Sequence, residues 1–352
     1  MAANSIRIGN FMIGTEHPPF VIAEMSGNHN QSLERALAIV EAAAKSGAHA
    51  LKLQTYTADT MTIDHADGEF FISDPKSLWQ GHSLYDLYQK AHTPWQWHAP
   101  IMERARQLGM VCFSTPFDAS AVDFLESLKV PCYKIASFEN TDLALIRKAA
   151  ETGKPIIIST GMATLSELSE TVRVARSAGC RDIVLLKCTS AYPASPADAN
   201  IRTISHMRDL FQCQVGLSDH TMGLGVALSG VALGATVIEK HFTLCRADGG
   251  VDSAFSLEPE ELQTLVRETN GAWQALGNIS YEPTPSEKAS MVFRRSLYIT
   301  EDIMPGEKLS TDNMRAIRPG YGLAPKYLPM LIGKKVNQAL KRGTPVTLDV
   351  IG

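Results

Sequence analysis

Eight short apolar runs constrain the fold of this chain more than any other feature of its sequence. Most of them end in a polar residue, and each is followed by a stretch with helical spacing of apolar residues. This alternation is typical of βαβ units in a parallel sheet. Eight such strands are the number that closes a (β/α)8 barrel, the TIM barrel. The runs are 20–24, 50–54, 111–115, 132–135, 156–159, 183–187, 215–218 and 236–241.

The segments between these runs support the barrel. Residues 33–46 and 165–178 carry apolar residues at i, i+3 and i+4 spacing, which predicts amphipathic helices packed outside the barrel. Gly47, Gly153 and Gly179 follow three such segments, where glycine commonly caps a helix. The opening stretch 6–13 predicts a small hairpin ahead of the first barrel strand. We expect this hairpin to plug the barrel floor.

Two irregular stretches indicate the domain organisation. Tyr56–Thr93, which contains Trp79, is much longer than an ordinary βα loop and predicts a lid over the catalytic face. Near Pro283 and Pro285 the strand and helix alternation stops, and short strand-like runs separated by turns follow. We therefore expect a barrel domain at 1–278, a linker at 279–290 and a small β-rich module at 291–352.

Composition limits the class of partner. The chain has a hydrophobic content of 45%, a charged content of 20% and a net charge of −4, which are ordinary for a soluble globular protein. It has no run of basic residues of the kind that binds nucleic acid. The six cysteines are scattered without zinc or disulfide spacing, so we expect reduced thiols. No apolar stretch has signal-peptide or membrane-spanning length. We expect a cytoplasmic protein whose partners are small molecules or another copy of the chain, with neither nucleic acid nor membrane.

The polar residues at the ends of the runs are the candidate active site, because TIM-barrel sites lie at the carboxyl ends of the strands. Any one of them could simply satisfy a turn or a hydrogen bond. Together they indicate a site, because ionisable residues rarely sit at a barrel mouth without partners or a task. They are Glu24, Lys52, Gln54, Thr115, Lys134, Ser137, Ser159, Lys187, Ser190, Ser218, His220 and His241.

Two histidines could hold a metal ion. His220 and His241 follow consecutive strands, which must be neighbours in a barrel, so their imidazoles could converge on one cation. Two nitrogens with water and a carboxylate suit Mn²⁺, Co²⁺, Zn²⁺ or Fe²⁺ better than Mg²⁺, which prefers oxygen ligands. The alternative is two buried, hydrogen-bonded histidines.

A basic, hydroxyl-rich rim suits an acidic ligand. Lys52 and Lys134 lie among several serines, as a phosphate with an attached carboxylate would require. The chain has no complete nucleotide-binding fingerprint. Glu24 is the best carboxylate for acid–base work, although it could serve only to hold Lys52. His29 is a further catalytic candidate that could instead bond the backbone.

A set of motifs in one order resembles the sialic acid synthase family. They are Ile22–Glu24, Gly27–Asn30, Lys52–Thr55, Ser114–Phe117, Tyr133–Ser137, Ser159–Met162, Gly216–Thr221 and Glu239–Phe242. Arg294–Leu297 and Arg318–Gly320 extend the resemblance to that family's C-terminal domain. The resemblance implies a TIM barrel followed by a β-clip (SAF, antifreeze-like) domain. It also implies a transferase that condenses phosphoenolpyruvate with an amino-sugar aldehyde.

The resemblance further implies the role of each residue. Glu24, Lys52, His220 and His241 would be catalytic, and the two histidines would bind a divalent metal, Mn²⁺ first with Mg²⁺ or Co²⁺ as alternatives. Phosphoenolpyruvate would be held by Thr115, Lys134, Ser137, Ser159, Ser190 and Ser218. The sugar side would carry Gln54, Tyr192 and Asp252, with Lys52 beside them. Arg318 would reach the sugar site of the partner in a domain-swapped homodimer.

Three motifs are similar to the branch of this family that makes pseudaminic acid. They are Gly81–Tyr88, Thr93–His98 and Lys187–Ser190. The implied sugar is 2,4-diacetamido-2,4,6-trideoxy-L-altrose, and the alternatives are N-acetylneuraminate or legionaminate synthesis. Two rival hypotheses remain from the residues. One is a Schiff-base aldolase using Lys52, Lys134, Lys187 or Lys240. The other is a non-catalytic sugar-binding protein.

Overall fold

The chain forms two compact units. The computed structural model describes residues 4–75 and 77–352. One unit ends at Gly277 and the other spans Asn278–Gly352. The division therefore falls just before the proline-containing stretch at which the sequence predicts the end of the barrel.

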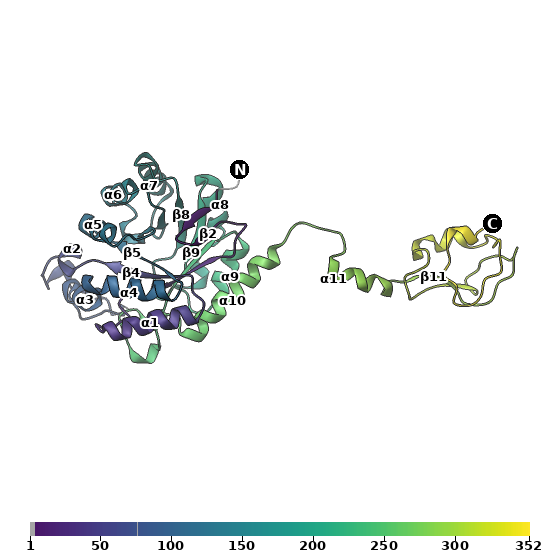
Figure 1. Cartoon of the computed structure of the whole chain (residues 1–352), viewed down its shortest axis with the longest axis horizontal. Coiled ribbons are helices and arrows are strands. Elements are labelled where there is room, and N and C mark those ends of the chain that lie inside the picture. Colours follow the sequence, from purple (N-terminus) through teal and green to yellow (C-terminus); the bar gives the residue numbers. More distant parts are fainter. Residues whose placement is uncertain (1–3, 76) are drawn as a thin grey trace. The chain divides into compact units, whose positions relative to one another are not determined.

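The first unit is a closed barrel of eight parallel strands (Figure 1), which confirms the predicted fold. Each strand pairs with its neighbours in chain order, and the last strand, β10, pairs with the first, β3. The strands are β3 Phe20–Glu24, β4 Ala50–Thr55, β5 Val111–Pro116, β6 Tyr133–Ile135, β7 Ile156–Ser159, β8 Ile183–Cys188, β9 Gln214–Ser218 and β10 Val237–His241. Their bounds lie within one residue of the predicted runs.

Helices follow the barrel strands and pack around them (Figure 1). They are α1 Leu33–Lys45, α4 Trp95–Gln107, α5 Ala119–Ser127, α6 Leu143–Glu151, α7 Leu165–Ser177, α8 Thr203–Phe211, α9 Gly225–Ala232 and α10 Pro259–Leu276. The predicted glycine caps are confirmed, because Gly47, Gly153 and Gly179 have φ values of 84°, 72° and 99°, which favour glycine. None of the described helices is long and apolar enough to cross a bilayer.

Side chains alternate between two cores along every strand. Val21 and Ala23 of β3 belong to the core beneath the outer helices. Phe20 and Ile22 belong to a second core that fills the barrel lumen. The hairpin of β1 (Ile6–Ile8) and β2 (Phe11–Ile13) contributes Ile6, Ile8 and Ile13 to this second core, so the predicted floor plug is confirmed.

The predicted lid contains two helices. Residue 76 lies outside the described residues; the rest of Tyr56–Thr93 includes α2 Ala58–Met61 and α3 Leu84–Ala91. Ser83 caps α3 by accepting a hydrogen bond from the backbone N–H of Asp86. Neither helix is long enough to show a clear apolar period, so the sequence predicts only a loop here.

The second unit is a small module with its own core. Its two-stranded antiparallel sheet pairs β11 Ser296–Ile299 with β12 Met314–Ile317, and isolated bridges extend the β structure. The linker and module also contain α11 Pro285–Lys288 and α12 Leu328–Leu331. The core residues are Leu297, Ile299, Ile303, Leu309, Met314, Leu331, Val336, Leu340, Val346 and Val350.

Candidate active site

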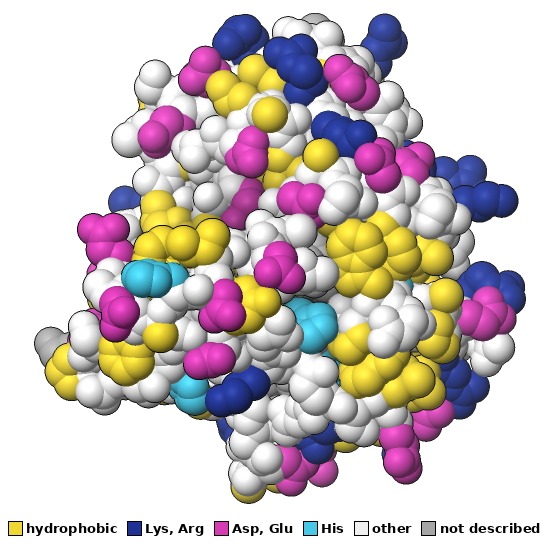
Figure 2. Space-filling model, turned by 90° about the vertical axis from the view of Figure 1, so that its left-hand side faces the viewer, with side chains coloured by type: hydrophobic (Ala, Val, Ile, Leu, Met, Phe, Trp, Pro, Cys, Tyr) yellow, Lys and Arg dark blue, Asp and Glu magenta, His cyan; other side chains and the backbone are white. Residues whose placement is uncertain are grey.

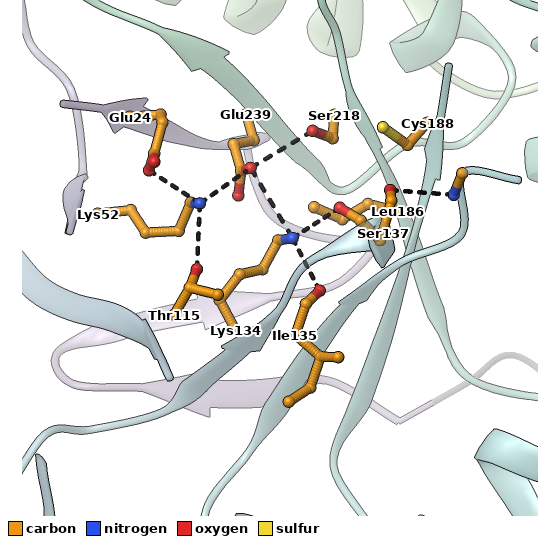
Figure 3. A network of polar contacts seen from close by, with 12 residues as sticks. Glu24, Lys52, Thr115, Lys134, Ile135, Ser137, Leu186, Cys188, Ser218 and Glu239 are labelled. Atoms are coloured by element: carbon orange, nitrogen blue, oxygen red, sulfur yellow. Dashed lines mark hydrogen bonds and ion pairs between the residues drawn. The ribbon is translucent and has the colours of Figure 1, made fainter. Parts of the chain in front are cut away.

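The upper part of the barrel lumen is polar and charged. Every second side chain of a barrel strand points into the lumen. On β3, Phe20 and Ile22 belong to the apolar lumen core, and Glu24 is the next residue of the strand that points the same way. The same parity brings Lys52, Thr115, Lys134, Ser218 and Glu239 into one network (Figure 3). The expected convergence of strand-end residues is therefore present in the structure.

Two buried lysines and two buried carboxylates form the centre of this network (Figure 3). The Lys52 ammonium lies 2.8 Å from Glu24 Oε2 and 3.4 Å from Glu239 Oε1. Lys134 Nζ lies 3.9 Å from the same Glu239 oxygen. Gln54 Nε2 donates to Glu24 Oε1 at 2.9 Å. The two lysines and the two glutamates are almost fully buried, so their charges interact more strongly than they would in water.

The two carboxylates have opposite pKa shifts. Burial, only partly opposed by the Lys52 ammonium, raises the pKa of Glu24 to about 7. Burial also raises the pKa of Glu239, but Lys134 and Lys52 outweigh it and hold that pKa below its ordinary range. Paired acids whose environments separate their pKa values take different roles. Glu24 is suited to proton transfer, whereas Glu239 is a permanent counter-ion for the two lysines.

A cradle of hydroxyls lies beside Lys134. Lys134 Nζ donates to Ser159 Oγ at 2.6 Å, and the Gly161 N–H donates to Ser137 Oγ at 3.1 Å. A Cβ atom built at Gly161 would lie 2.2 Å from Ser190 Oγ and 2.6 Å from Ser137 Oγ, so only glycine fits between them. These hydroxyls and the ammonium form a donor-rich surface suited to an anion.

His220 and His241 lie side by side, with ring centroids 5.3 Å apart. His220 Nδ1 is 2.9 Å from the Thr189 carbonyl oxygen, which leaves Nε2 for another ligand. His241 Nδ1 is buried and makes no hydrogen bond. Burial, then the charge of His220, lowers the pKa of His241 well below its ordinary value. A neutral imidazole with a free nitrogen beside a carbonyl-anchored imidazole fits a metal ion.

The described residues around this histidine pair do not provide a third His, Cys, Asp or Glu ligand. Among residues 4–75 and 77–352, no group of three or more His, Cys, Asp or Glu side chains could hold a metal together. Asp252 Oδ2 lies 3.7 Å from His241 Nδ1 and instead bonds the Ser26 hydroxyl. A metal held here would complete its coordination with water or substrate oxygens.

Aromatic rings form a wall next to the imidazoles. Tyr192 lies 4.4 Å from His220, and Phe255 lies 4.9 Å from His241, measured between ring centroids. Trp79 of the lid segment lies 6.0 Å from Tyr192 and donates its indole N–H to the Val251 carbonyl at 3.0 Å. A cavity of about 530 Å³ opens beside Trp79 and Val251. The lid segment therefore reaches the loop that carries Asp252.

Several candidates lie away from this network. Lys187 Nζ donates to the Cys188 carbonyl and the Thr189 hydroxyl, and Lys240 pairs with Asp219. His29 is buried, and its two ring nitrogens contact the Thr93 hydroxyl and the Gln31 backbone N–H. These contacts hold loops. Arg318 is an exposed residue of the second unit.

Glu239 and Cys188 are site residues that the sequence analysis missed. Glu239 bridges both lysines, and its Oε2 is buried without a hydrogen-bond partner. Cys188 Sγ lies 3.8 Å from Ser190 Oγ and 3.9 Å from His220 Nδ1. The available signal was strand parity, since Glu239 is two residues before His241 and Cys188 is two residues before Ser190.

Comparison with known proteins identifies the family. The NeuB family matches residues 39–281, and the SAF domain matches residues 294–351. The chain belongs to the NeuB family. The predicted C-terminal SAF domain is confirmed, and so is the predicted resemblance to sialic acid synthases.

Individual relatives of this NeuB protein span nearly its whole length. Pseudaminic acid synthase of Helicobacter pylori is 44% identical over 336 residues, covering 95% of this chain and 98% of the relative. N,N'-diacetyllegionaminic acid synthase of Legionella pneumophila is 37% identical and covers 96% of each chain. The solved N-acetylneuraminic acid synthetase of Leptospira borgpetersenii has a TM-score of 0.73 at 31% identity, covering 82% of this chain and 95% of that one. The prediction of an enzyme is confirmed by these relatives.

Proposed function

We propose that this NeuB protein condenses phosphoenolpyruvate with 2,4-diacetamido-2,4,6-trideoxy-L-altrose to form pseudaminic acid and phosphate. The observation that carries the proposal is the placement of two imidazoles beside a buried, basic, hydroxyl-lined cradle in one lumen. Such a cradle suits an acidic three-carbon donor. The imidazole pair suits a cation that would face the aldehyde of the sugar.

The cradle side is the site proposed for phosphoenolpyruvate. Lys134 supplies a buried positive charge, and Ser137, Ser159, Ser190 and Ser218 supply hydroxyls, with Thr115 beside Lys52. Lys52 pairs with both carboxylates, Glu24 and Glu239, close to the reacting atoms. Gln54, Tyr192 and Asp252 belong to the sugar side. Gln54 bonds Glu24 and therefore links the two halves of the site.

His220 and His241 would hold the divalent metal, which we propose is Mn²⁺, with Mg²⁺ or Co²⁺ as alternatives. When bound, such a cation supplies Lewis acidity that polarises a carbonyl oxygen. The phenol ring of Tyr192 lies against His220 and would help to orient the open-chain sugar. A protein site this deeply buried also excludes bulk water from the reacting groups.

The proposed reaction forms one carbon–carbon bond and breaks one carbon–oxygen bond. C3 of phosphoenolpyruvate attacks the aldehyde carbon, and the aldehyde oxygen takes up a proton to become a hydroxyl. Positive charge develops at C2, where the Glu24 carboxylate stabilises it. Water adds to C2 and gives one proton to Glu24, which passes it to the oxygen of the former aldehyde. The C2–O bond to the phosphate then breaks, and the C2 hydroxyl gives its proton to the departing phosphate, which leaves a carbonyl at C2.

Relatives favour the pseudaminate branch over its alternatives. Three pseudaminic acid synthases are 41–44% identical to this chain, whereas two N,N'-diacetyllegionaminic acid synthases are 36–37% identical. The human N-acetylneuraminate-9-phosphate synthase is 30% identical. Legionaminate and N-acetylneuraminate synthesis therefore remain the alternatives that the substrate test must separate.

We further propose a domain-swapped homodimer in the cytoplasm, acting on small molecules without nucleic acid or membrane. Arg318 would enter the sugar site of the partner subunit. Its exposure within the second unit leaves its guanidinium available for such a contact. On the face shown in Figure 2, Lys and Arg lie mainly near the edges, while acidic and hydrophobic side chains spread across the middle. This distribution does not favour a polyanion on that face.

Phosphate release is the direct test of the function. The enzyme with phosphoenolpyruvate and Mn²⁺ is assayed against the altrose derivative, its legionaminate counterpart and N-acetylmannosamine. We expect the altrose derivative to have the highest kcat/KM. Label in the bridging oxygen should leave with phosphate, and oxygen from labelled water should enter C2. Label in the opposite positions refutes the proposed bond cleavage, and preference for N-acetylmannosamine refutes the branch.

The pKa of Glu24 predicts a pH dependence. Because the carboxylate is the form that accepts a proton, activity should rise with pH as Glu24 ionises, with a midpoint set by its pKa of about 7. The Glu24→Gln variant should lose this rise and retain a weak, flatter profile. Measuring kcat/KM from acid to neutral pH for both proteins checks this. An identical acid limb in the variant would assign the ionisation to another group.

A further inference from the structure

A buried ion pair joins the residues that precede the two site histidines. Lys240 Nζ lies 2.8 Å from Asp219 Oδ2, and their side chains are only 1% and 2% exposed. Asp219 immediately precedes His220, and Lys240 immediately precedes His241. The pair lies outside the Glu24–Lys52–Glu239–Lys134 network and has no role in the proposed reaction.

Every proton of the Lys240 ammonium has an acceptor. Besides Asp219, Nζ donates to the Thr221 carbonyl at 2.7 Å and the Gly223 carbonyl at 3.0 Å. A lysine ammonium has three protons, so these three acceptors saturate it. A lysine held in this way is not free to act as a Schiff-base nucleophile. Its function is therefore to hold the backbone at 219–223.

Asp219 holds the same turn from the other side. Its Oδ1 accepts from the Thr221 N–H at 2.9 Å and from the Thr221 hydroxyl at 2.8 Å. The Asp219 N–H donates to the Glu239 carbonyl at 2.9 Å, which continues the β9–β10 ladder beyond the last residue of β9. His220 therefore sits in a turn whose flanking residues are both fixed to β10.

Resting on the metal site proposed above, we propose that Asp219 and Lys240 are positioning residues that set the location of His220 relative to His241. Side chains of adjacent residues on a strand point to opposite sides, so the pair lies behind the turn while the imidazoles face the lumen. Two imidazoles can share one cation only if their spacing is held within a fraction of an ångström. The ion pair supplies that constraint through the backbone.

Metal affinity measured without substrates tests this role. The double variant Asp219→Asn/Lys240→Met removes both charges together and so leaves no unpaired buried charge. We expect its Kd for Mn²⁺, measured by electron paramagnetic resonance, to rise by about 10- to 100-fold, the range typical of lost outer contacts to metal ligands. Binding of phosphoenolpyruvate should stay within about twofold, because Lys134, Ser137 and Ser159 belong to other elements and only Ser218 of the proposed cradle adjoins this turn.

A matched control separates positioning from general destabilisation. Glu126 and Lys154 form another ion pair of the barrel unit, and neither contacts the histidines. The Glu126→Gln/Lys154→Met variant should keep the parent Kd for Mn²⁺. If a folded Asp219→Asn/Lys240→Met variant also keeps the parent Kd, the positioning role is overturned, while the proposed metal site is unaffected. If the parent itself binds no Mn²⁺, or binds it equally after His241→Ala, both the inference and the proposed metal site fall.

A milder variant tests the same inference if the double variant does not fold. Thr221→Val removes one hydroxyl contact to Asp219 and leaves the ion pair intact. We expect a smaller loss of Mn²⁺ affinity, about three- to tenfold, in line with the loss of one hydrogen bond of about 1 kcal/mol. An unchanged Kd in this folded variant would count against a positioning role for the turn.

Discussion

Replacing His241 with alanine is expected to lower kcat/KM for phosphate release by about 10³-fold or more, because Lewis-acid catalysis is worth several kcal/mol. His241 offers the buried, hydrogen-bond-free nitrogen of the pair, and its low pKa keeps the ring neutral. The variant should also lose its response to added Mn²⁺. Steady-state assays after chelation and metal re-addition check both effects.

A histidine remote from the lumen provides the control. His206 lies exposed on α8, so His206→Ala should retain the activity and metal response of the parent. Unchanged activity of the parent after exhaustive chelation would show that the reaction needs no metal. Activity of His241→Ala that is fully restored by Mn²⁺ at the parent concentration would remove this residue from the metal site.

Replacing Lys134 with methionine is expected to produce the second large effect. Lys134 Nζ lies among Ser159 Oγ, the Ile135 carbonyl and Glu239, at the centre of the proposed phosphoenolpyruvate cradle. Removing one member of a buried, hydrogen-bonded charge pair costs about 2–5 kcal/mol. We therefore expect kcat/KM for phosphoenolpyruvate to fall by about 30- to several thousand-fold, mainly through KM, with metal affinity kept.

Lys187 provides a matched control for the Lys134→Met variant. Lys187→Met removes a lysine that, among the described contacts, bonds only the adjacent Cys188 carbonyl and Thr189 hydroxyl, so the KM for phosphoenolpyruvate should not change.

The aldolase hypothesis can be tested on the same lysine, Lys134. Burial lowers the pKa of Lys134, which is also what a Schiff-base lysine requires. Borohydride with pyruvate should leave the parent unmodified. Covalent trapping on Lys134 would replace our proposal with an aldolase.

Strand-end chemistry could be predicted because barrel geometry is so regular. The predicted runs locate eight strands within one residue, and eleven of the twelve strand-end candidates belong to the lumen and its rim. The exception is Lys187, which lies on the other face of β8. A one-residue uncertainty in strand position reverses the face that a side chain occupies. The apolar pattern alone could therefore not decide which of the four lysines of the aldolase hypothesis point into the lumen.

Glu239 shows the limit of that approach. In the sequence, Glu239 is a single glutamate within the strand run 236–241, and such a residue suggests no particular partner. Its significance comes from Lys52 and Lys134, which lie on β4 and β6 and approach it only across the lumen. The lid is a similar case, since Trp79 contacts Val251 and Tyr192 although no local pattern connects these segments.

Sequence by itself determined the number and order of the strands, the end of the barrel and the residue types at its mouth, because apolar periodicity and turn residues are local signals. Tertiary structure alone decided which of those residues meet. Closure of the barrel pairs β10 with β3 and brings His241 beside Glu24, from the last and first barrel strands. Burial in that closed lumen then separates the pKa values of Glu24 and Glu239, since desolvation and neighbouring charge depend on distances that no local pattern contains.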